Sequence, residues 1–166
     1  MNQDRRLSCG DQARLNETGI QQAKAAAEFL EDVPYDFVLS SPYSRARGTA
    51  EIANRDRAPI LTDDRLVERD AGVLDGRRFE EIDLSGFFNY YKNIEYEGAE
   101  NLQDFCKRVW GFLDEIKETR RDKSILLVTH NIVIRAIKAY ILGIPEDGDI
   151  GTYGIKNGDI EAYTLE

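Results

Sequence analysis

The sequence predicts an α/β fold in which helices flank a mainly parallel sheet, and three observations lead to this prediction. Two short apolar runs, at residues 37–39 and within SILLVTH at residues 124–130, are typical of buried parallel strands. A helical pattern follows each run. Along the chain the order is helix, strand, helix, cap, helix, strand, helix and hairpin, which is an α/β order.

The first helix is predicted over residues 19–31, in an alanine-rich stretch. Thr18 and Gln21 have capping-box spacing at its start, and Pro34 follows its end. A second helix is predicted at residues 44–55. This opening departs from the usual pattern, because an α/β domain normally begins with a strand, whereas here a polar loop and a helix come first.

A loop and an aromatic segment follow the second helix. Residues 58–76 carry few periodic signals, and Gly72 and Gly76 mark them as an ordered loop, a kind of segment that often carries function. Residues 77–100 are expected to form a cap-like insertion over the larger domain. We interpret the aromatic rings of this segment as local core rather than as ligand contacts. These rings are Phe79, Phe87, Phe88, Tyr90, Tyr91 and Tyr96.

The second half of the chain holds the clearest helix. Asn101 is available as its N-cap, and its apolar residues recur at three- and four-residue spacing. They are Leu102, Phe105, Val109, Phe112, Leu113 and Ile116. After the second strand, NIVIRAIKAYILG is predicted to be a helix that Gly143 closes. The tail GTYGIKNGDIEAYTL is predicted to form a hairpin around Asn157 and Gly158.

Size and composition restrict the function classes. A chain of 166 residues is long enough for one domain, so residues 1–166 are expected to form a single fold with a single site. Acidic residues outnumber basic ones by 31 to 22, and the net charge of -9 argues against a nucleic acid or a membrane surface as partner. With no apolar signal segment and no stretch of roughly 20 apolar residues, a cytoplasmic protein is expected. Cys9 and Cys106 lack metal-ligand spacing and are expected to be free thiols.

Reactive side chains follow both predicted strands. In open α/β sheets the ligand crevice lies beyond the carboxyl ends of the strands. Arg45 begins the helix after one strand, and His130, the only histidine in the sequence, follows the other. Alone, His130 is more often a satisfied core residue and Arg45 a solvated helix residue. With Glu68 in the following loop, however, they supply the cation, the imidazole and the carboxylate that phosphoryl transfer needs.

Four blocks of sequence carry a resemblance to a known family. The blocks are SSPYSRARGTAEIA, LVERDAGVLDG, YEGAENLQDFCKRVWGFLDE and LLVTHNIVIRAIKAYILG. In this order and spacing they closely resemble the histidine phosphatase superfamily, in its phosphoglycerate-mutase-like branch, over nearly the whole chain. The resemblance implies a three-layer sandwich in which the cap sets substrate preference. It also implies transfer of phosphate from a small phosphorylated metabolite to a histidine and then to water or another hydroxyl, with no metal and no nucleotide cofactor.

The resemblance also implies roles for individual residues. Arg45 would clamp the phosphoryl group, Glu68 would donate a proton to the leaving oxygen, and His130 would hydrogen-bond the phosphoryl oxygens. Asn2 matches an asparagine that helps to hold phosphate. Asn131 stands where a glycine is more usual after the histidine, and it is placed with the phosphate-binding residues.

The sequence departs from the family at its beginning. The family's nucleophilic histidine lies in an Arg-His-Gly turn after a first, central strand, and this sequence contains neither. His130 matches the supporting histidine, and its position on that side would spoil the in-line geometry that its own phosphorylation needs. Loss of the nucleophile from a coupled catalytic set, as in subtilisin, costs on the order of a million-fold in rate, or about 8 kcal/mol of barrier. We therefore expect little or no turnover from this chain as written.

The missing strand leaves a slot in the expected sheet, and unpaired edges favour association. Either a rearranged segment or another chain fills the slot, the latter giving an oligomer, or the natural gene is longer and Met1 is not its start. Two functions stay open: a phosphomonoesterase or mutase, and a pseudoenzyme that binds a phospholigand or inorganic phosphate, or serves as an interaction module. The charge of -9 favours a ligand with one phosphate over a bisphosphate.

Overall fold

The structure is a computed structural model that describes residues 6–11 and 14–165, and it confirms the predicted α/β class. A parallel sheet lies at its centre, with the strand order β2-β1-β3. The strands are β1 (Phe37–Ser40), β2 (Ile60–Thr62) and β3 (Ile125–Val128). The interpretation of residues 58–76 as loop alone was therefore wrong. A strand as short as β2 cannot display a period, and its pairing with β1 decides its conformation.

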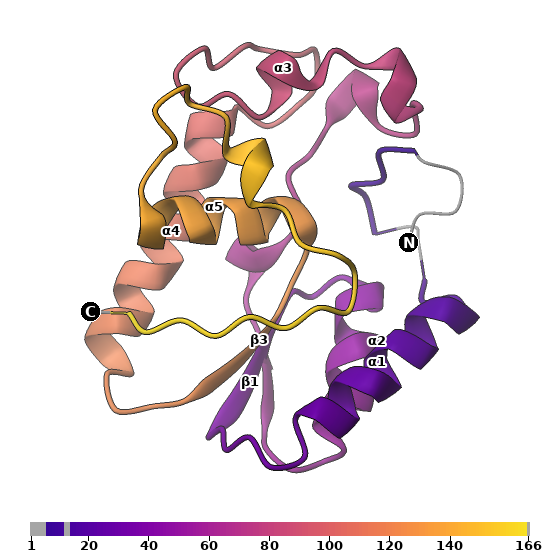
Figure 1. Ribbon diagram of the computed structural model, residues 1–166, viewed down its shortest axis with the longest axis vertical. Coiled ribbons are helices and arrows are strands. Elements are labelled where there is room, and N and C mark those ends of the chain that lie inside the picture. Colours follow the sequence, from indigo (N-terminus) through magenta and orange to yellow (C-terminus); the bar gives the residue numbers. More distant parts are fainter. Residues whose placement is uncertain (1–5, 12–13, 166) are drawn as a thin grey trace.

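The helices form a layer on each face of the sheet (Figure 1). They are α1 (Glu17–Phe29), α2 (Ser44–Asn54), α4 (Leu102–Thr119) and α5 (Asn131–Leu142). Because successive strand residues face opposite ways, Phe37 and Leu39 pack in the core that α4 and α5 cover. Leu126 faces the other way and packs with Ala26 of α1 and Ala53 of α2. The result is the expected three-layer arrangement.

Helix ends follow capping chemistry, with one correction. Asn16 caps α1 by accepting a hydrogen bond from the backbone of Gly19 at 2.9 Å, so the capping box predicted at Thr18 was wrong. Asn is the stronger N-cap residue, and it starts the helix two residues earlier than predicted. The predicted cap at Asn101 is confirmed, as is the helix end at Gly143, whose φ of +86° favours glycine.

The aromatic segment at residues 77–100 lies at one end of the molecule (Figure 1). Phe87 and Phe88 are buried, and Phe79, Tyr90 and Tyr96 pack against the same core, whereas Tyr91 is 60% exposed. The rings are thus local core in all cases but Tyr91. The short helices here and just before are η1 (Asp64–Leu66), η2 (Gly72–Leu74), η3 (Phe79–Glu81) and α3 (Leu84–Phe87).

The predicted C-terminal hairpin does not form. After α5 comes a 3-10 helix, η4 (Ile150–Tyr153), and no strand pairing follows up to residue 165. Only the turn is present, with the amide of Asp159 donating to the carbonyl oxygen of Lys156 at 3.1 Å. Ile160 and Leu165 pack against the body of the molecule instead of pairing two arms of a hairpin.

One edge of β3 is left open within the described residues. The carbonyl oxygens of Ser124 and Val128 accept hydrogen bonds from the segment of β1 at 2.8 and 3.0 Å. Because backbone groups alternate along a strand, the amides of Ile125 and Leu127 point to the other edge, where the described part of the chain places no strand. All four residues of β3 are half-buried, whereas those of β1 are fully buried.

Candidate functional site

The carboxyl ends of β1 and β3 bring Ser41 and His130 into contact. The backbone amide of Ser41 donates to the carbonyl oxygen of Val128 at 3.0 Å, which joins the two strand ends. The Nε2 atom of His130 lies 2.8 Å from Oγ of Ser41, and both residues are buried. His130 is also the residue that immediately precedes α5. Parallel pairing therefore joins two residues that lie 89 positions apart in the sequence.

The surroundings keep the imidazole of His130 neutral. Burial lowers the pKa of His130 to about 3, the positive charge of Arg45 acts in the same direction, and Asp11 opposes both. The ring of Tyr43 packs against the imidazole at 5.3 Å between centres. At neutral pH the ring thus carries one N–H and one lone pair, so it binds ligands by hydrogen bonding rather than by charge.

Arg45 supplies the positive charge of the site from the first turn of α2. Its guanidinium donates to the carbonyl oxygen of Gly10 and, at 3.5 Å, to that of Cys9, and it lies over the ring of Tyr43. Its charge lowers the pKa of both His130 and Glu68. Arg45 therefore lies close enough to Glu68 and His130 for its charge to act on both.

The segment from Cys9 to Asp11 borders this site. The carboxylate of Asp11 accepts hydrogen bonds from the amide and the hydroxyl of Ser44, at 2.7 and 3.0 Å. The amide of Cys9 donates to Asp75 at 2.8 Å. Burial, followed by the charge of Glu68, raises the pKa of the Cys9 thiol, so this sulfur stays protonated and is a poor nucleophile. Both cysteines are free, as predicted, and both are buried.

Glu68 is a buried carboxyl group whose oxygens face two backbone amides. Oε1 accepts from the amide of Arg69 at 3.2 Å, and Oε2 from that of Ile132, in the first turn of α5, at 3.4 Å. Burial raises the pKa of Glu68 to about 7, against the opposing effects of these amides and of Arg45. A carboxyl group with this pKa holds a proton and releases it near neutral pH, which suits a general acid or base.

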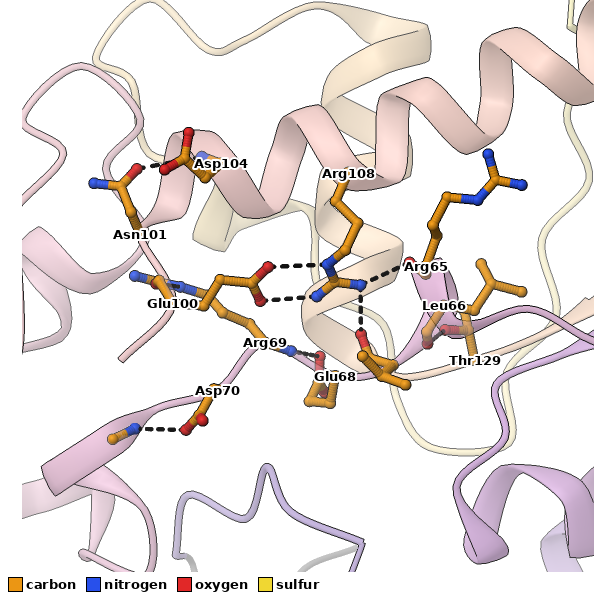
Figure 2. Close-up of polar contacts among 12 residues, drawn as sticks. Arg65, Leu66, Glu68, Arg69, Asp70, Glu100, Asn101, Asp104, Arg108 and Thr129 are labelled. Atoms are coloured by element: carbon orange, nitrogen blue, oxygen red, sulfur yellow. Dashed lines mark hydrogen bonds and ion pairs between the residues drawn. The ribbon is translucent and has the colours of Figure 1, made fainter. Parts of the chain in front are cut away.

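Arg108 of α4 holds the segment that carries Glu68. Figure 2 shows its guanidinium paired with both carboxylate oxygens of Glu100, at 2.8 and 2.9 Å. The same group donates to the carbonyl oxygens of Arg65 and Val67, at 2.7 and 3.2 Å. Just after β3, the hydroxyl of Thr129 donates to the carbonyl oxygen of Leu66 at 2.9 Å. Two elements therefore fix the backbone on which Glu68 depends.

The two predicted asparagines have different outcomes. Asn131 is the first residue of α5, but its side chain is engaged within the protein. It donates to the carbonyl oxygen of Ile155 and accepts from Nε of Arg135 at 3.0 Å. Its backbone amide remains at the helix N-terminus, where anions are favoured. Asn2 lies outside the described residues.

Sequence reasoning missed three residues that shape the site. Ser41 could have been found, because it follows its strand just as His130 follows the other. Arg108 carried no signal beyond being a polar residue on an amphipathic helix, and two of its partners are backbone carbonyls of a distant segment. Arg69 is 1% exposed, and it donates to the carbonyl oxygens of Phe87 and Glu100, at 2.6 and 2.9 Å, which ties the aromatic segment to the site.

Within residues 6–11 and 14–165, no group of three or more His, Cys, Asp or Glu side chains is placed to hold a metal ion. In that same part of the chain, no helix has the length and apolar character to cross a membrane. Two cavities, of about 280 and 220 Å³, lie away from the catalytic candidates, one under α4 and one beside α1.

Known proteins resemble this chain over most of its length. The sequence profile of the histidine phosphatase superfamily (branch 1) matches residues 1–164. Phosphoserine phosphatase 1 of Hydrogenobacter thermophilus is 31% identical over 159 residues, which are 92% of this chain and 75% of that protein. The probable phosphoglycerate mutase GpmB of Salmonella arizonae is 30% identical over 151 residues, 87% of this chain and 70% of that protein.

A solved structure shares the fold. The structure of a putative alpha-ribazole-5'-P phosphatase from Escherichia coli superimposes with a TM-score of 0.80 at 26% identity, covering 95% of this chain and 80% of that one. The range that the superfamily profile matches includes Arg45, Glu68 and His130. The likeness therefore extends over the part of the chain that forms the candidate site.

Proposed function

Because this chain belongs to the histidine phosphatase superfamily (branch 1), we propose that its site binds the phosphoryl group of small phosphomonoesters. The chemistry is hydrolysis or phosphoryl transfer through a phosphohistidine. The observation that carries the proposal is the convergence of Arg45, Glu68 and His130 beyond the carboxyl ends of β1 and β3.

Each residue has a role that its surroundings support. Arg45 balances the negative charge of the phosphoryl oxygens, and the N-termini of α2 and α5 add backbone N–H groups. His130, being neutral, donates one hydrogen bond to the phosphoryl group. Glu68, with a pKa of about 7, protonates the leaving oxygen. Asn131 contributes its backbone amide, and Asn2 remains a proposed phosphate ligand.

We propose that this chain by itself turns over little or no substrate. Its sequence contains one histidine, and this residue, His130, matches the family's supporting histidine and is buried against Ser41. A phosphohistidine route with a separate supporting imidazole needs a second histidine, which these 166 residues do not supply. An acceptor supplied from outside the chain would restore the route.

A second function has its own support. Arg45, the neutral His130 and two helix N-termini form an anion-binding set that does not need a nucleophile. A phospholigand-binding module would use the same set without turnover. For such a module, the open edge of β3 is an interaction surface that a second chain covers. A cytoplasmic location for the protein suits both functions.

Turnover and binding assays separate the two functions. Hydrolysis of p-nitrophenyl phosphate that falls at least a hundredfold in Glu68→Gln supports an enzyme, since general acid catalysis contributes about 10²–10⁴ in rate. Phosphate binding without turnover, lost in Arg45→Ala, supports the binding module.

The matched control is Arg47→Ala. Arg47 lies on the same helix as Arg45, but it is exposed and pairs with Glu51. If phosphate binds Arg45→Ala as tightly as it binds the unmodified protein, the proposed site is wrong for both functions.

A further inference from the structure

The two ring nitrogens of His130 have different surroundings. Nε2 lies 2.8 Å from Oγ of Ser41. Nδ1 makes no hydrogen bond within the described residues, and the imidazole does not cap α5 through its side chain. Nε2 is therefore engaged within the protein, whereas no described residue occupies Nδ1. A ligand in the site therefore meets Nδ1 and not Nε2.

The hydroxyl of Ser41 decides which nitrogen carries the proton. Its oxygen already accepts a hydrogen bond from the amide of Tyr43 at 3.3 Å. Its hydrogen finds no other acceptor among the described residues, and Ser41 is fully buried. A buried hydroxyl hydrogen without an acceptor is costly, so the hydroxyl donates to Nε2. In a neutral imidazole that accepts at Nε2, the proton sits on Nδ1.

We propose that Ser41 is a positioning residue that holds His130 in the Nδ1–H tautomer, and that this N–H is the donor His130 offers to a phosphoryl oxygen. The second half of the inference rests on the proposed function. The first half does not, because it concerns the protein without ligand. In the opposite tautomer the lone pair of Nδ1 would face the phosphoryl oxygens and repel them.

The strand ends hold this arrangement in place. The amide of Ser41 is bonded to Val128, just two residues before His130, so the sheet ladder holds together the two backbones that carry the hydroxyl and the imidazole. Tyr43 packs on the imidazole as well as bonding to Ser41, which limits rotation of the ring. The positions of Ser41 and His130 are thus set by backbone contacts that do not depend on a ligand.

Nitrogen NMR reads the tautomer directly, because His130 is the only histidine in the sequence. In ¹⁵N-labelled protein at pH 7, two-bond ¹⁵N–¹H correlations are expected to show a protonated Nδ1 and an unprotonated Nε2. Ser41→Ala is expected to move the population toward the Nε2–H form and to weaken phosphate binding on the order of tenfold. Ser41→Thr keeps the hydroxyl and is expected to restore the Nδ1–H form.

Ser40→Ala is the matched control. Ser40 is as fully buried as Ser41, but its hydroxyl donates to the backbone of Ser41 and does not touch the imidazole. A protonated Nε2 in the unmodified protein, or the same spectrum in Ser41→Ala and Ser40→Ala, would overturn the inference.

Added phosphate separates this inference from the proposed function. Phosphate is expected to shift the Nδ1 resonance in the unmodified protein. If the tautomer changes in Ser41→Ala but phosphate moves no His130 resonance, the positioning role stands, while phosphoryl binding at Nδ1 and the proposed function fail.

Discussion

Glu68 and His130 are both buried next to α5, and burial shifts their pKa values in opposite directions. Removal from water disfavours the charged form of each group. The pKa of Glu68 therefore rises to about 7 and that of His130 falls to about 3. Near neutral pH the site holds a carboxyl group able to give up a proton and an imidazole that stays neutral. Glu68 can therefore transfer a proton, whereas His130 can donate a hydrogen bond without losing its proton.

The raised pKa of Glu68 predicts a change of stability with pH. The folded protein holds the proton more strongly than the unfolded chain, whose Glu pKa is 4.5. The stabilising contribution is therefore full below pH 4.5 and is lost as the pH rises to about 7. From about pH 4.5 to pH 8, the free energy of unfolding, measured with urea, is expected to fall more for the unmodified protein than for Glu68→Gln. The difference between the two decreases is expected to be on the order of 3 kcal/mol.

Comparison with Glu68→Gln also removes the contribution of His130 to the pH dependence of stability. His130 has a lowered pKa, so its contribution is present above the unfolded value of 6.5 and is lost as the pH falls toward 3. Both proteins keep His130, and the difference between them isolates Glu68. Identical pH profiles for the two proteins would show that Glu68 titrates normally.

At the scale of elements, α4 holds the site in place without touching the ligand region. Through Arg108 it pairs with Glu100 and donates to two carbonyl oxygens of the segment before Glu68, and this salt bridge is largely buried. The helix also bonds to α5, since Nε1 of Trp110 donates to the carbonyl oxygen of Ala136 at 2.8 Å. α4 therefore links Glu68 to the helix that follows His130.

Arg108→Gln is expected to lower the free energy of unfolding by about 1–3 kcal/mol, because it leaves Glu100 and two carbonyl groups without their donor. Lys107→Gln is the control on the same helix, since Lys107 is exposed and pairs only with Asp104 among the described residues. Surface pairs of this kind contribute about 0–1 kcal/mol. Urea denaturation measures the free energy of unfolding of both variants. Equal decreases in the two variants would mean that Arg108 does not stabilise the segment before Glu68.

At the scale of the whole molecule, the open edge of β3 is a strand edge without a partner in the described residues. Exposed strand edges template pairing with another chain. The apolar sequence ILLV and the half-buried state of all four β3 residues suit a strand with neighbours on both sides. We therefore propose that association covers this edge.

Hydrogen exchange at two protein concentrations tests the association. The amides of Ile125 and Leu127 point to the open edge, and they are expected to exchange more slowly at high concentration, by at least tenfold. The amide of Ser41, which is bonded to Val128 within the sheet, is the internal control and should not change. Concentration-independent exchange at Ile125 and Leu127, with a monomeric mass in sedimentation, would contradict the proposal.

Some features could be predicted because a local signal carries them. Asn101 and Gly143 end their helices through bonds and backbone angles of their own neighbourhood. Other features depend on distant contacts. β2 exists because β1 lies beside it, and the C-terminal hairpin fails because Ile160 finds apolar partners on α1 and α2. Neither effect leaves a trace in the nearby sequence.

The amino-acid sequence determined the α/β class, the helix and strand pattern apart from its shortest strand and the C-terminal hairpin, and the residue types that meet at the site. It could do so because periodicity and residue order are local properties. Only the tertiary structure decided that Ser41 bonds to His130, that Arg108 holds the segment before Glu68, and how far burial changes each pKa. The physical reason is that desolvation and hydrogen-bond geometry depend on which distant segments come to surround a group.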